Sequence, residues 1–208
     1  MTRYFTCLVL ALALTGCKTA IYRNDFKKAA AGNVPAEMLV LDGAFAVREE
    51  GGSKFLELPG APLDTYGALF GPTETNGLAV SARIHGTSKG RRFPTFGVGL
   101  NGVGGHRLLV SPGKRLLELY RGDEVVASAP YSWVTDSWTM LRLQCRKIKD
   151  GEYKIEGKAW KQGDAEPKEW QIALTEKSET PAGRPSLWGN PYAGTAIRYD
   201  DLRVTKAE

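Results

Sequence analysis

The residues that could do chemistry begin with two adjacent carboxylates, Asp200 and Asp201, inside the last apolar run of the chain. The apolar residues around the pair alternate in opposite phases, with Ile197 and Tyr199 before it and Leu202 and Val204 after it. The inward phase therefore slips by one residue, which predicts a β-bulge at the pair. A bulge can turn a carboxylate toward the rim, where Asp42 and carbonyl oxygens would complete an oxygen-rich, structural Ca²⁺ site, because the first and last strands of such domains often pair. In the alternative, one aspartate accepts backbone N–H bonds that fix the closing strand, and the other faces water.

Three aromatic side chains, Trp160, Trp188 and Tyr192, are the candidates for ligand binding. If the alternation of apolar and polar residues continues up to Trp160, its ring shares the polar face with Glu156, where the C–H face of a sugar could stack on it. If Gly157 forms a bulge instead, Trp160 returns to the core. Trp188 and Tyr192 flank a Gly-Asn-Pro loop, which either plugs an edge of the fold or binds a glycan.

Other motifs lack the context that their chemistry needs. Residues 89–92, Lys-Gly-Arg-Arg, are a basic turn that is either a solvated loop or a site for an acidic polysaccharide or a phosphate-bearing surface. Residues 97–102 match Gly-x-Gly-x-x-Gly, but the Val-Gly-Gly that follows cannot begin the helix that holds a pyrophosphate, so we interpret them as a glycine-rich hairpin. Cys145 is in phase with Leu141 and Leu143, which predicts a buried strand position and not a nucleophile.

The N-terminus carries the most specific motif. Residues 5–14 are an apolar run about half as long as a helix that crosses a ~30 Å hydrocarbon core, which is typical of a signal peptide. Leu-Thr-Gly-Cys follows at residues 14–17 and resembles the bacterial lipobox. The resemblance implies cleavage after residues 1–16 and acylation of Cys17, which would anchor the protein in the lipid bilayer. Lys18 in place of an aspartate is compatible with the outer membrane if the host has two membranes, so the expected location is the cell envelope. An ordinary secretory signal with a chance cysteine is the alternative.

The rest of the chain alternates apolar and polar residues with a period of two, as strands of antiparallel sheets around a shared core do. The clearest runs are residues 78–84, 153–159 and 170–174. Turn-forming residues separate such runs, as at Asn76-Gly77, Asn101-Gly102, Arg121-Gly122-Asp123, Asp150-Gly151 and Gly163-Asp164. The pattern predicts about twelve strands and no long helix beyond residue 37.

The composition fits one globular domain. The chain has 208 residues, of which 42% are hydrophobic, and a net charge of +5 from 28 Lys and Arg against 23 Asp and Glu. These values exclude a disordered chain or a coiled coil, and the charge is too small to favour a nucleic-acid partner. We divide the chain into a signal peptide of residues 1–16, a lipid-anchored tether of residues 17–36 with a short helix over 24–31, and a β-sandwich of residues 37–208.

The second half of the chain resembles the concanavalin A-like jelly rolls, which include laminin-G-like modules and domains related to 3-keto-disaccharide hydrolases. The resemblance rests on the tryptophan that opens a long strand, the glycine-rich turn before a near-final strand and the closing aromatic-Asp-Asp-aliphatic strand, at residues 138–143, 181–189 and 197–204. It implies an all-β, two-sheet antiparallel jelly-roll sandwich. The hydrolase-like members also carry an early Trp-rich segment and an Asn-Ser-Gly motif, which this chain lacks.

Together, these features favour a membrane-anchored envelope lipoprotein whose jelly roll is a non-catalytic binding module for carbohydrate or another envelope component. One alternative is a glycoside-processing enzyme similar to the 3-keto-glycoside hydrolases. Glycoside hydrolysis needs two carboxylates about 5–10 Å apart, and the spacing Glu-x-Asp-x-x-Glu that would supply them is absent. The other alternative is a structural subunit of an envelope complex, in which exposed aromatic side chains would contact a protein partner.

Overall fold

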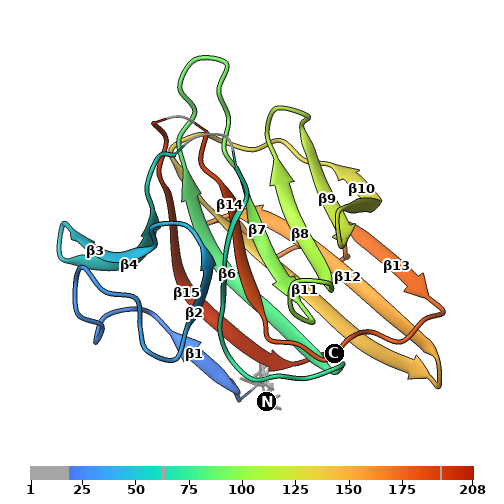
Figure 1. The fold of residues 1–208 in the computed structure, drawn as a ribbon. Coiled ribbons are helices and arrows are strands. Elements are labelled where there is room, and N and C mark those ends of the chain that lie inside the picture. Colours follow the sequence, from blue (N-terminus) through green and yellow to red (C-terminus); the bar gives the residue numbers. More distant parts are fainter. Residues whose placement is uncertain (1–18, 62–63, 193) are drawn as a thin grey trace, which may run out of the picture.

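The computed structural model describes residues 19–61, 64–192 and 194–208, and Figure 1 shows how its elements are arranged. In these residues the chain forms fifteen strands and no helix, and the paired strands all run antiparallel. It follows that none of the described segments is a helix able to cross a bilayer. The signal peptide and Cys17 lie outside the described residues, so their assignment stays a prediction.

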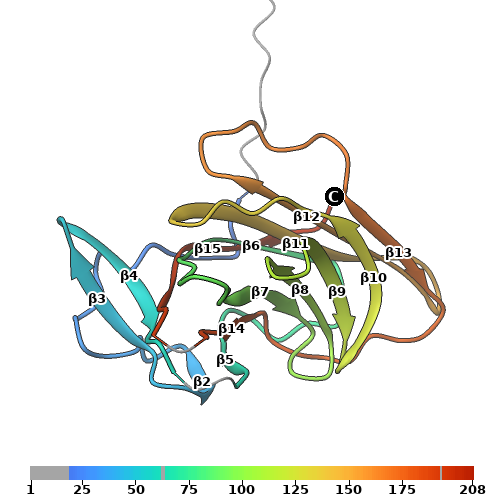
Figure 2. The ribbon, with the colours of Figure 1, turned by 90° about the horizontal axis from the view of Figure 1, so that it is seen from above.

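The strands form two sheets that stack as layers, as Figure 2 shows from above. One sheet has eight strands in the order β13-β12-β11-β6-β15-β4-β3, with β1 also paired to β15. Its strands are β1 (Tyr22–Asn24), β3 (Ala46–Glu50), β4 (Ser53–Leu58), β6 (Leu78–Gly86), β11 (Ser137–Lys149), β12 (Glu152–Lys161), β13 (Ile172–Glu176) and β15 (Ile197–Lys206). The other sheet has seven strands in the order β10-β9-β8-β7-β14-β5-β2. Its strands are β2 (Leu39–Asp42), β5 (Tyr66–Leu69), β7 (Thr95–Leu100), β8 (His106–Ser111), β9 (Leu116–Arg121), β10 (Glu124–Pro130) and β14 (Ser186–Asn190). The all-β jelly-roll sandwich is thereby confirmed.

The core lies between the sheets and follows the predicted alternation. In β6, Val80, Ala82 and Ile84 are fully buried, whereas Ser81 and Arg83 between them are only partly buried. The facing sheet contributes buried side chains from its own alternate positions, among them Phe96, Val98, Leu108, Leu117 and Leu119. Burial of this continuous apolar layer is the main source of stability in such a sandwich.

Two local predictions are confirmed. The register between β15 and β6 shifts between Asp200 and Arg203, and Asp201 has a φ of 49°, so a bulge does lie at the acid pair. Cys145 is buried, 1% exposed, and burial raises the pKa of its thiol to about 11, as expected for an inert strand position.

The predicted tether and its short helix are wrong for the residues that the structure describes. Tyr22–Asn24 pairs with residues 202–204 of β15, and the chain that follows turns back against the sandwich without forming a helix. Phe26 enters the core and is 1% exposed, and the ring of Tyr22 packs on Phe70 with 5.5 Å between centroids. The physical reason is the edge of β15: β4 pairs with it only at residues 197–199, and β1 covers the edge beyond.

Candidate functional site

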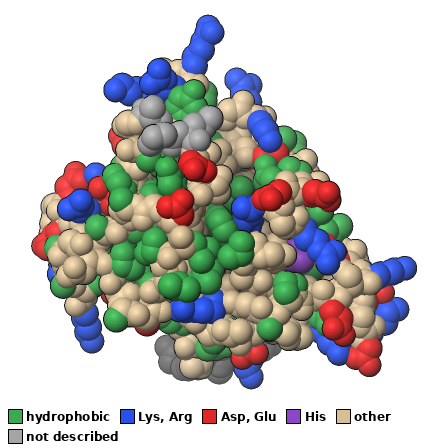
Figure 3. Space-filling view, viewed as in Figure 1, with side chains coloured by type: hydrophobic (Ala, Val, Ile, Leu, Met, Phe, Trp, Pro, Cys, Tyr) green, Lys and Arg blue, Asp and Glu red, His purple; other side chains and the backbone are tan. Residues whose placement is uncertain are grey.

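A cleft of about 500 Å³ opens on the outer face of the seven-stranded sheet, which is turned toward the reader in Figure 1. Strands β8, β9 and β14 supply its floor, and the loop between β6 and β7 supplies a wall through residues 91–93. In the same view, Figure 3 shows hydrophobic side chains gathered on this face with Lys and Arg side chains around them. Because successive residues of a strand point to opposite faces, every second residue of β8 and β9 is available to this surface.

Trp188 forms part of the floor and lies flat on the sheet. Its neighbours in the sheet are glycines: a Cβ atom on Gly67 would lie 3.0 Å from indole Cε3, and one on Gly99 would lie 3.0 Å from Nε1. The indole Nε1 donates a hydrogen bond of 2.8 Å to Ser186 Oγ, which fixes the ring in its plane. Trp188 is a strand residue and only 6% exposed, so the loop predicted over residues 188–192 is wrong at its start, because β14 continues to Asn190.

Arg107 covers this indole. Its guanidinium carbon lies 4.7 Å from the centroid of the Trp188 ring and 5.6 Å from that of Tyr120, so the cation is held between two aromatic faces. Arg107 Nη2 donates to the carbonyl of Gly122 and, over 3.0 Å, to Asp123 Oδ1. The free surface above Trp188 is therefore a guanidinium and not an indole.

A buried carboxylate lies beside this pair. Glu118, 3% exposed, accepts hydrogen bonds from Ser111 Oγ and, over 2.9 Å, from Lys114 Nζ. The hydrogen bond to Glu118 raises the pKa of Lys114, which stays charged at neutral pH. Burial, together with the charge of Glu118, raises the pKa of Tyr120, so its hydroxyl stays protonated. The Glu118–Lys114 pair is thus internally neutral.

Tyr192 lines the same cleft from the segment that follows β14. The guanidinium of Arg92 lies 5.7 Å from the centroid of its ring, so the aromatic side chain meets the basic turn of residues 89–92. Phe93 on the same wall is 38% exposed. Two of the three predicted aromatic residues, Trp188 and Tyr192, are therefore brought together.

Trp160 lies on the opposite sheet. The pairing of β11 with β12 is regular through Gly157, so no bulge returns Trp160 to the core, and it shares the outer face with Lys158. There it lines a second cleft of about 530 Å³ together with Asp201 and Arg142. This cleft is separate from the one that holds Trp188 and Tyr192.

The expected Ca²⁺ site does not assemble. Arg83 forms ion pairs with both carboxylates: its Nη2 lies 2.5 Å from Asp200 Oδ2, and its Nε lies 3.0 Å from Asp201 Oδ2. Burial raises the pKa of Asp200 despite this partner. Asp42 lies on β2 in the other sheet, where its Oδ1 accepts the N–H of Gly43 over 2.7 Å. In the described part of the chain, no group of three His, Cys, Asp or Glu side chains could hold a metal ion.

The candidate acids Glu118, Glu156 and Asp200 do not form the pair of carboxylates that a glycosidase needs. Glu118 lies on the seven-stranded sheet, whereas Glu156 and Asp200 lie on the eight-stranded sheet. Glu156 is itself held by hydrogen bonds from Gln144 Nε2 over 2.7 Å and Arg146 Nε over 3.1 Å. Each of these three carboxylates forms an ion pair with a nearby Lys or Arg side chain.

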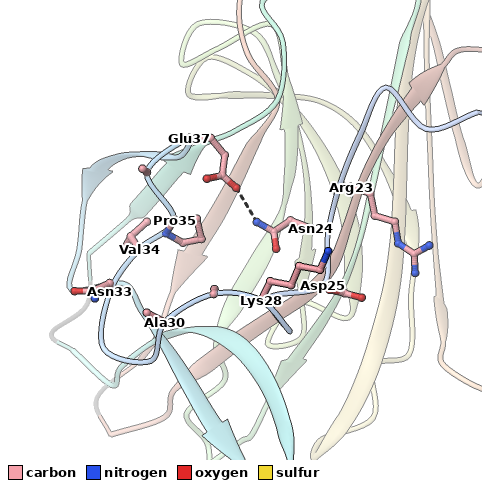
Figure 4. Close-up of a pocket in the computed structure, with 11 residues that line it drawn as sticks. Arg23, Asn24, Asp25, Lys28, Ala30, Asn33, Val34, Pro35 and Glu37 are labelled. Atoms are coloured by element: carbon pink, nitrogen blue, oxygen red, sulfur yellow. Dashed lines mark hydrogen bonds between the residues drawn. The ribbon is translucent and has the colours of Figure 1, made fainter.

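A third cleft, of about 640 Å³, lies beside the segment that follows β1, and Figure 4 shows the residues that line it. Its side chains are small or flexible, and none is aromatic. The Nδ2 of Asn24 donates to Glu37 Oε1 over 3.0 Å, a contact that joins the two ends of the segment. We attribute this cleft to the path of the segment and not to ligand binding.

The sequence interpretation missed Arg107 and Tyr120. One signal was present: Arg107 is a lone charge in the otherwise apolar run Leu-Leu-Val of β8, and a long cation at such a position has to be stabilised by something on the sheet face. Its partner Trp188 lies 81 positions further along the chain, and no local pattern connects them.

The chain is similar in fold, but not in sequence, to known proteins. No protein-family model matches the chain, and no curated protein is similar to it in sequence. Among solved structures, it is similar to the carbohydrate-binding module CBM66 from Bacillus subtilis, with 11% identity, a TM-score of 0.57, and coverage of 82% of this chain and 96% of that one. It is also similar to the Emp47p carbohydrate recognition domain, with 12% identity, a TM-score of 0.61 and coverage of 89% and 95%. A PL-14 alginate lyase from Aplysia kurodai gives 10% identity, a TM-score of 0.58 and coverage of 91% and 100%.

The chain thus has the same jelly-roll fold as these carbohydrate-binding domains. At 10–12% identity the likeness concerns the fold alone. The alginate lyase has the same architecture, so the fold itself does not separate binding from catalysis.

Proposed function

We propose that this protein is a carbohydrate-binding module that works through the cleft on the seven-stranded sheet. The observation that carries the proposal is the pairing in this cleft of partly exposed aromatic rings with guanidinium groups: Tyr120 with Arg107, and Tyr192 with Arg92. Sugars present apolar C–H faces and hydroxyl groups side by side, so they suit a surface of this mixed kind. The volume of about 500 Å³ also lies within the range of about 300–1,000 Å³ that is usual for small-ligand sites.

The similarity to carbohydrate-binding modules and lectin domains supports this proposal. Hydrolysis has less support, because Glu118 lies on one sheet, Glu156 and Asp200 lie on the other, and each of the three is paired locally. A role as a structural subunit would need an apolar interface. Leu39 and Leu41 of β2 are 53% and 39% exposed, but they lie at the edge of the sheet and outside the cleft.

The test is a glycan microarray, followed by titration calorimetry with the best glycan found. We expect Tyr192→Ala to weaken binding about tenfold, because it removes a stacking face. The matched control is Trp160→Ala, which removes a partly buried aromatic side chain from the opposite sheet and should leave affinity unchanged. Loss of binding with Trp160→Ala alone would move the site to the second cleft, and failure to bind any glycan would refute the proposal.

We also propose that acylated Cys17 anchors this module in a membrane of the cell envelope. The lipobox at residues 14–17 and the apolar run before it support this anchoring. In the native host, the protein should incorporate radiolabelled palmitate and Cys17→Ser should not. Labelling that persists in Cys17→Ser would show that this cysteine is not the acylation site.

A further inference from the structure

The cleft on the seven-stranded sheet is more cationic than a neutral ligand requires. Four of its lining residues carry a positive charge and one carries a negative charge: Arg91, Arg92, Arg107 and Lys114, against Asp123. The charge of Lys114 is balanced by its ion pair with buried Glu118. Three arginines therefore remain against one exposed aspartate, and two of them contact aromatic rings of the cleft.

Arg107 is the most constrained of these cations. Its side chain is 9% exposed, is held between the rings of Trp188 and Tyr120, and has an Nε atom without a hydrogen-bond partner among the described residues. A guanidinium fixed in this way loses little rotational freedom when it binds an anion, and its planar donors match the two oxygens of a carboxylate.

The protein itself neutralises Arg107 only weakly. Asp123 is the ion-pair partner, at 3.0 Å, but its side chain is fully exposed, at 103%, in the turn between β9 and β10. An ion pair with a solvated partner contributes little and is readily exchanged. The other acceptor is the uncharged carbonyl of Gly122. A desolvated cation on the floor of a cleft thus lacks a buried counter-charge.

We propose that the glycan bound in this cleft is acidic, and that Arg107 binds the carboxylate of a uronic-acid residue while Arg92 supplies a second positive charge at the rim. This inference rests on the proposed function and names its ligand class. A singly charged carboxylate on a sugar ring fits one partly engaged guanidinium beside the ring of Tyr120. A phosphate dianion would call for a larger set of free donors.

The experiment measures affinity for matched pairs of oligosaccharides by titration calorimetry. The probes are tetramers of galacturonate, mannuronate, guluronate and glucuronate, each beside the same tetramer with its carboxyl groups reduced to alcohols. We expect at least one acidic tetramer to bind, carboxyl reduction to weaken that binding at least about tenfold, and higher salt to weaken it further. Poly-glutamate, a polyanion without sugar rings, should not compete.

Variants of the cleft arginines test which of them binds the carboxylate of the acidic tetramer. Arg107→Gln and Arg107→Lys should each weaken binding of the acidic tetramer at least about tenfold, because lysine keeps the charge but lacks the planar donors. Arg92→Gln, at an exposed position that does not threaten the fold, should weaken it a few-fold. The matched control is Arg198→Gln, which removes an arginine stacked on Phe55 at 4.6 Å on the other sheet and should change nothing.

The outcomes separate this inference from the proposed function. Equal binding of the acidic and reduced tetramers, or Arg107 and Arg92 variants that bind like the unmodified protein, would overturn the acidic ligand and leave a neutral glycan module standing. Competition by poly-glutamate would overturn it as well, because the cleft would then select charge without sugar. Failure of both the tetramers and the neutral glycans of the microarray would refute both proposals.

Discussion

Gly189 sets how closely β14 approaches the opposite sheet, and its substitution gives a quantitative test. An alanine Cβ at this position would overlap Tyr199 Oη and would come within 2.9 Å of Leu58 Cδ2. Tyr199 is fully buried, and its hydroxyl donates a hydrogen bond of 3.1 Å to the carbonyl of Trp188. The contact therefore joins the core to the strand that carries the floor of the cleft.

We expect Gly189→Ala to lower the free energy of unfolding by about 2 kcal/mol through overpacking. Tyr199→Phe should lower it by about 1 kcal/mol, because the carbonyl of Trp188 loses its donor. The double variant should be destabilised by about 1 kcal/mol less than the sum of these two values, because Tyr199→Phe removes the atom that the new methyl group overlaps.

The measurement is urea unfolding followed by tryptophan fluorescence, with all four proteins of the cycle in one buffer. Gly104→Ala is the matched control, because no atom lies within 4 Å of a Cβ there, and its unfolding free energy should change by less than about 0.5 kcal/mol. Additivity of the two substitutions to within about 0.5 kcal/mol would refute the packing argument.

Three further outcomes can be checked. Burial would raise the pKa of Glu156, but hydrogen bonds from Lys154 and neighbouring donors outweigh burial and lower this pKa. Ionised Glu156 therefore stabilises the fold above about pH 4.3, and this contribution is lost as the pH falls further. In thermal melts across this range, Glu156→Gln should be less stable than the unmodified protein at neutral pH and less sensitive to acid, and an unchanged acid response would contradict this. The raised pKa and burial of Cys145 predict no reaction with a thiol reagent at neutral pH in the folded protein and full reaction in urea, and rapid native labelling would contradict it. Phe26→Ala should lower the free energy of unfolding by about 3 kcal/mol in urea titrations, and a loss under about 0.5 kcal/mol would show that the first strand folds independently of the core.

The sheets were predictable because their information is local. One buried face per sheet imposes a period of two on residues such as Val80, Ala82 and Ile84, and glycine at a turn marks where a strand ends, as Gly122 and Gly151 do with φ values of 54° and 69°. The bulge at Asp200 was also predictable from the sequence, because the alternation of apolar residues shifts by one position there and this shift is a local pattern. Side-chain alternation thus carried most of the architecture.

The cleft was less predictable because its contacts connect distant strands. Arg107 meets Trp188 only because β7 lies between β8 and β14 and carries Gly97 and Gly99 on the outer face, which leaves room for an indole and a guanidinium above bare backbone. The predicted metal site was wrong for the same reason. The pairing of Arg83 with Asp200 depends on which strand lies beside β15, and sequence spacing does not encode that choice.

The order of strands has a consequence for how the chain is made. β14 lies between β7 and β5, and β15 lies between β6 and β4, so the two final strands each complete the middle of a sheet. Neither layer can close until β14 and β15 have been synthesised. Among the described residues, seven of the thirteen strand pairings join strands that are not consecutive in the chain, which slows assembly. A nascent chain of this design therefore keeps both sheets incomplete until late in synthesis. A truncation that removes β15 alone would split the eight-stranded sheet, and one that also removes β14 would split both.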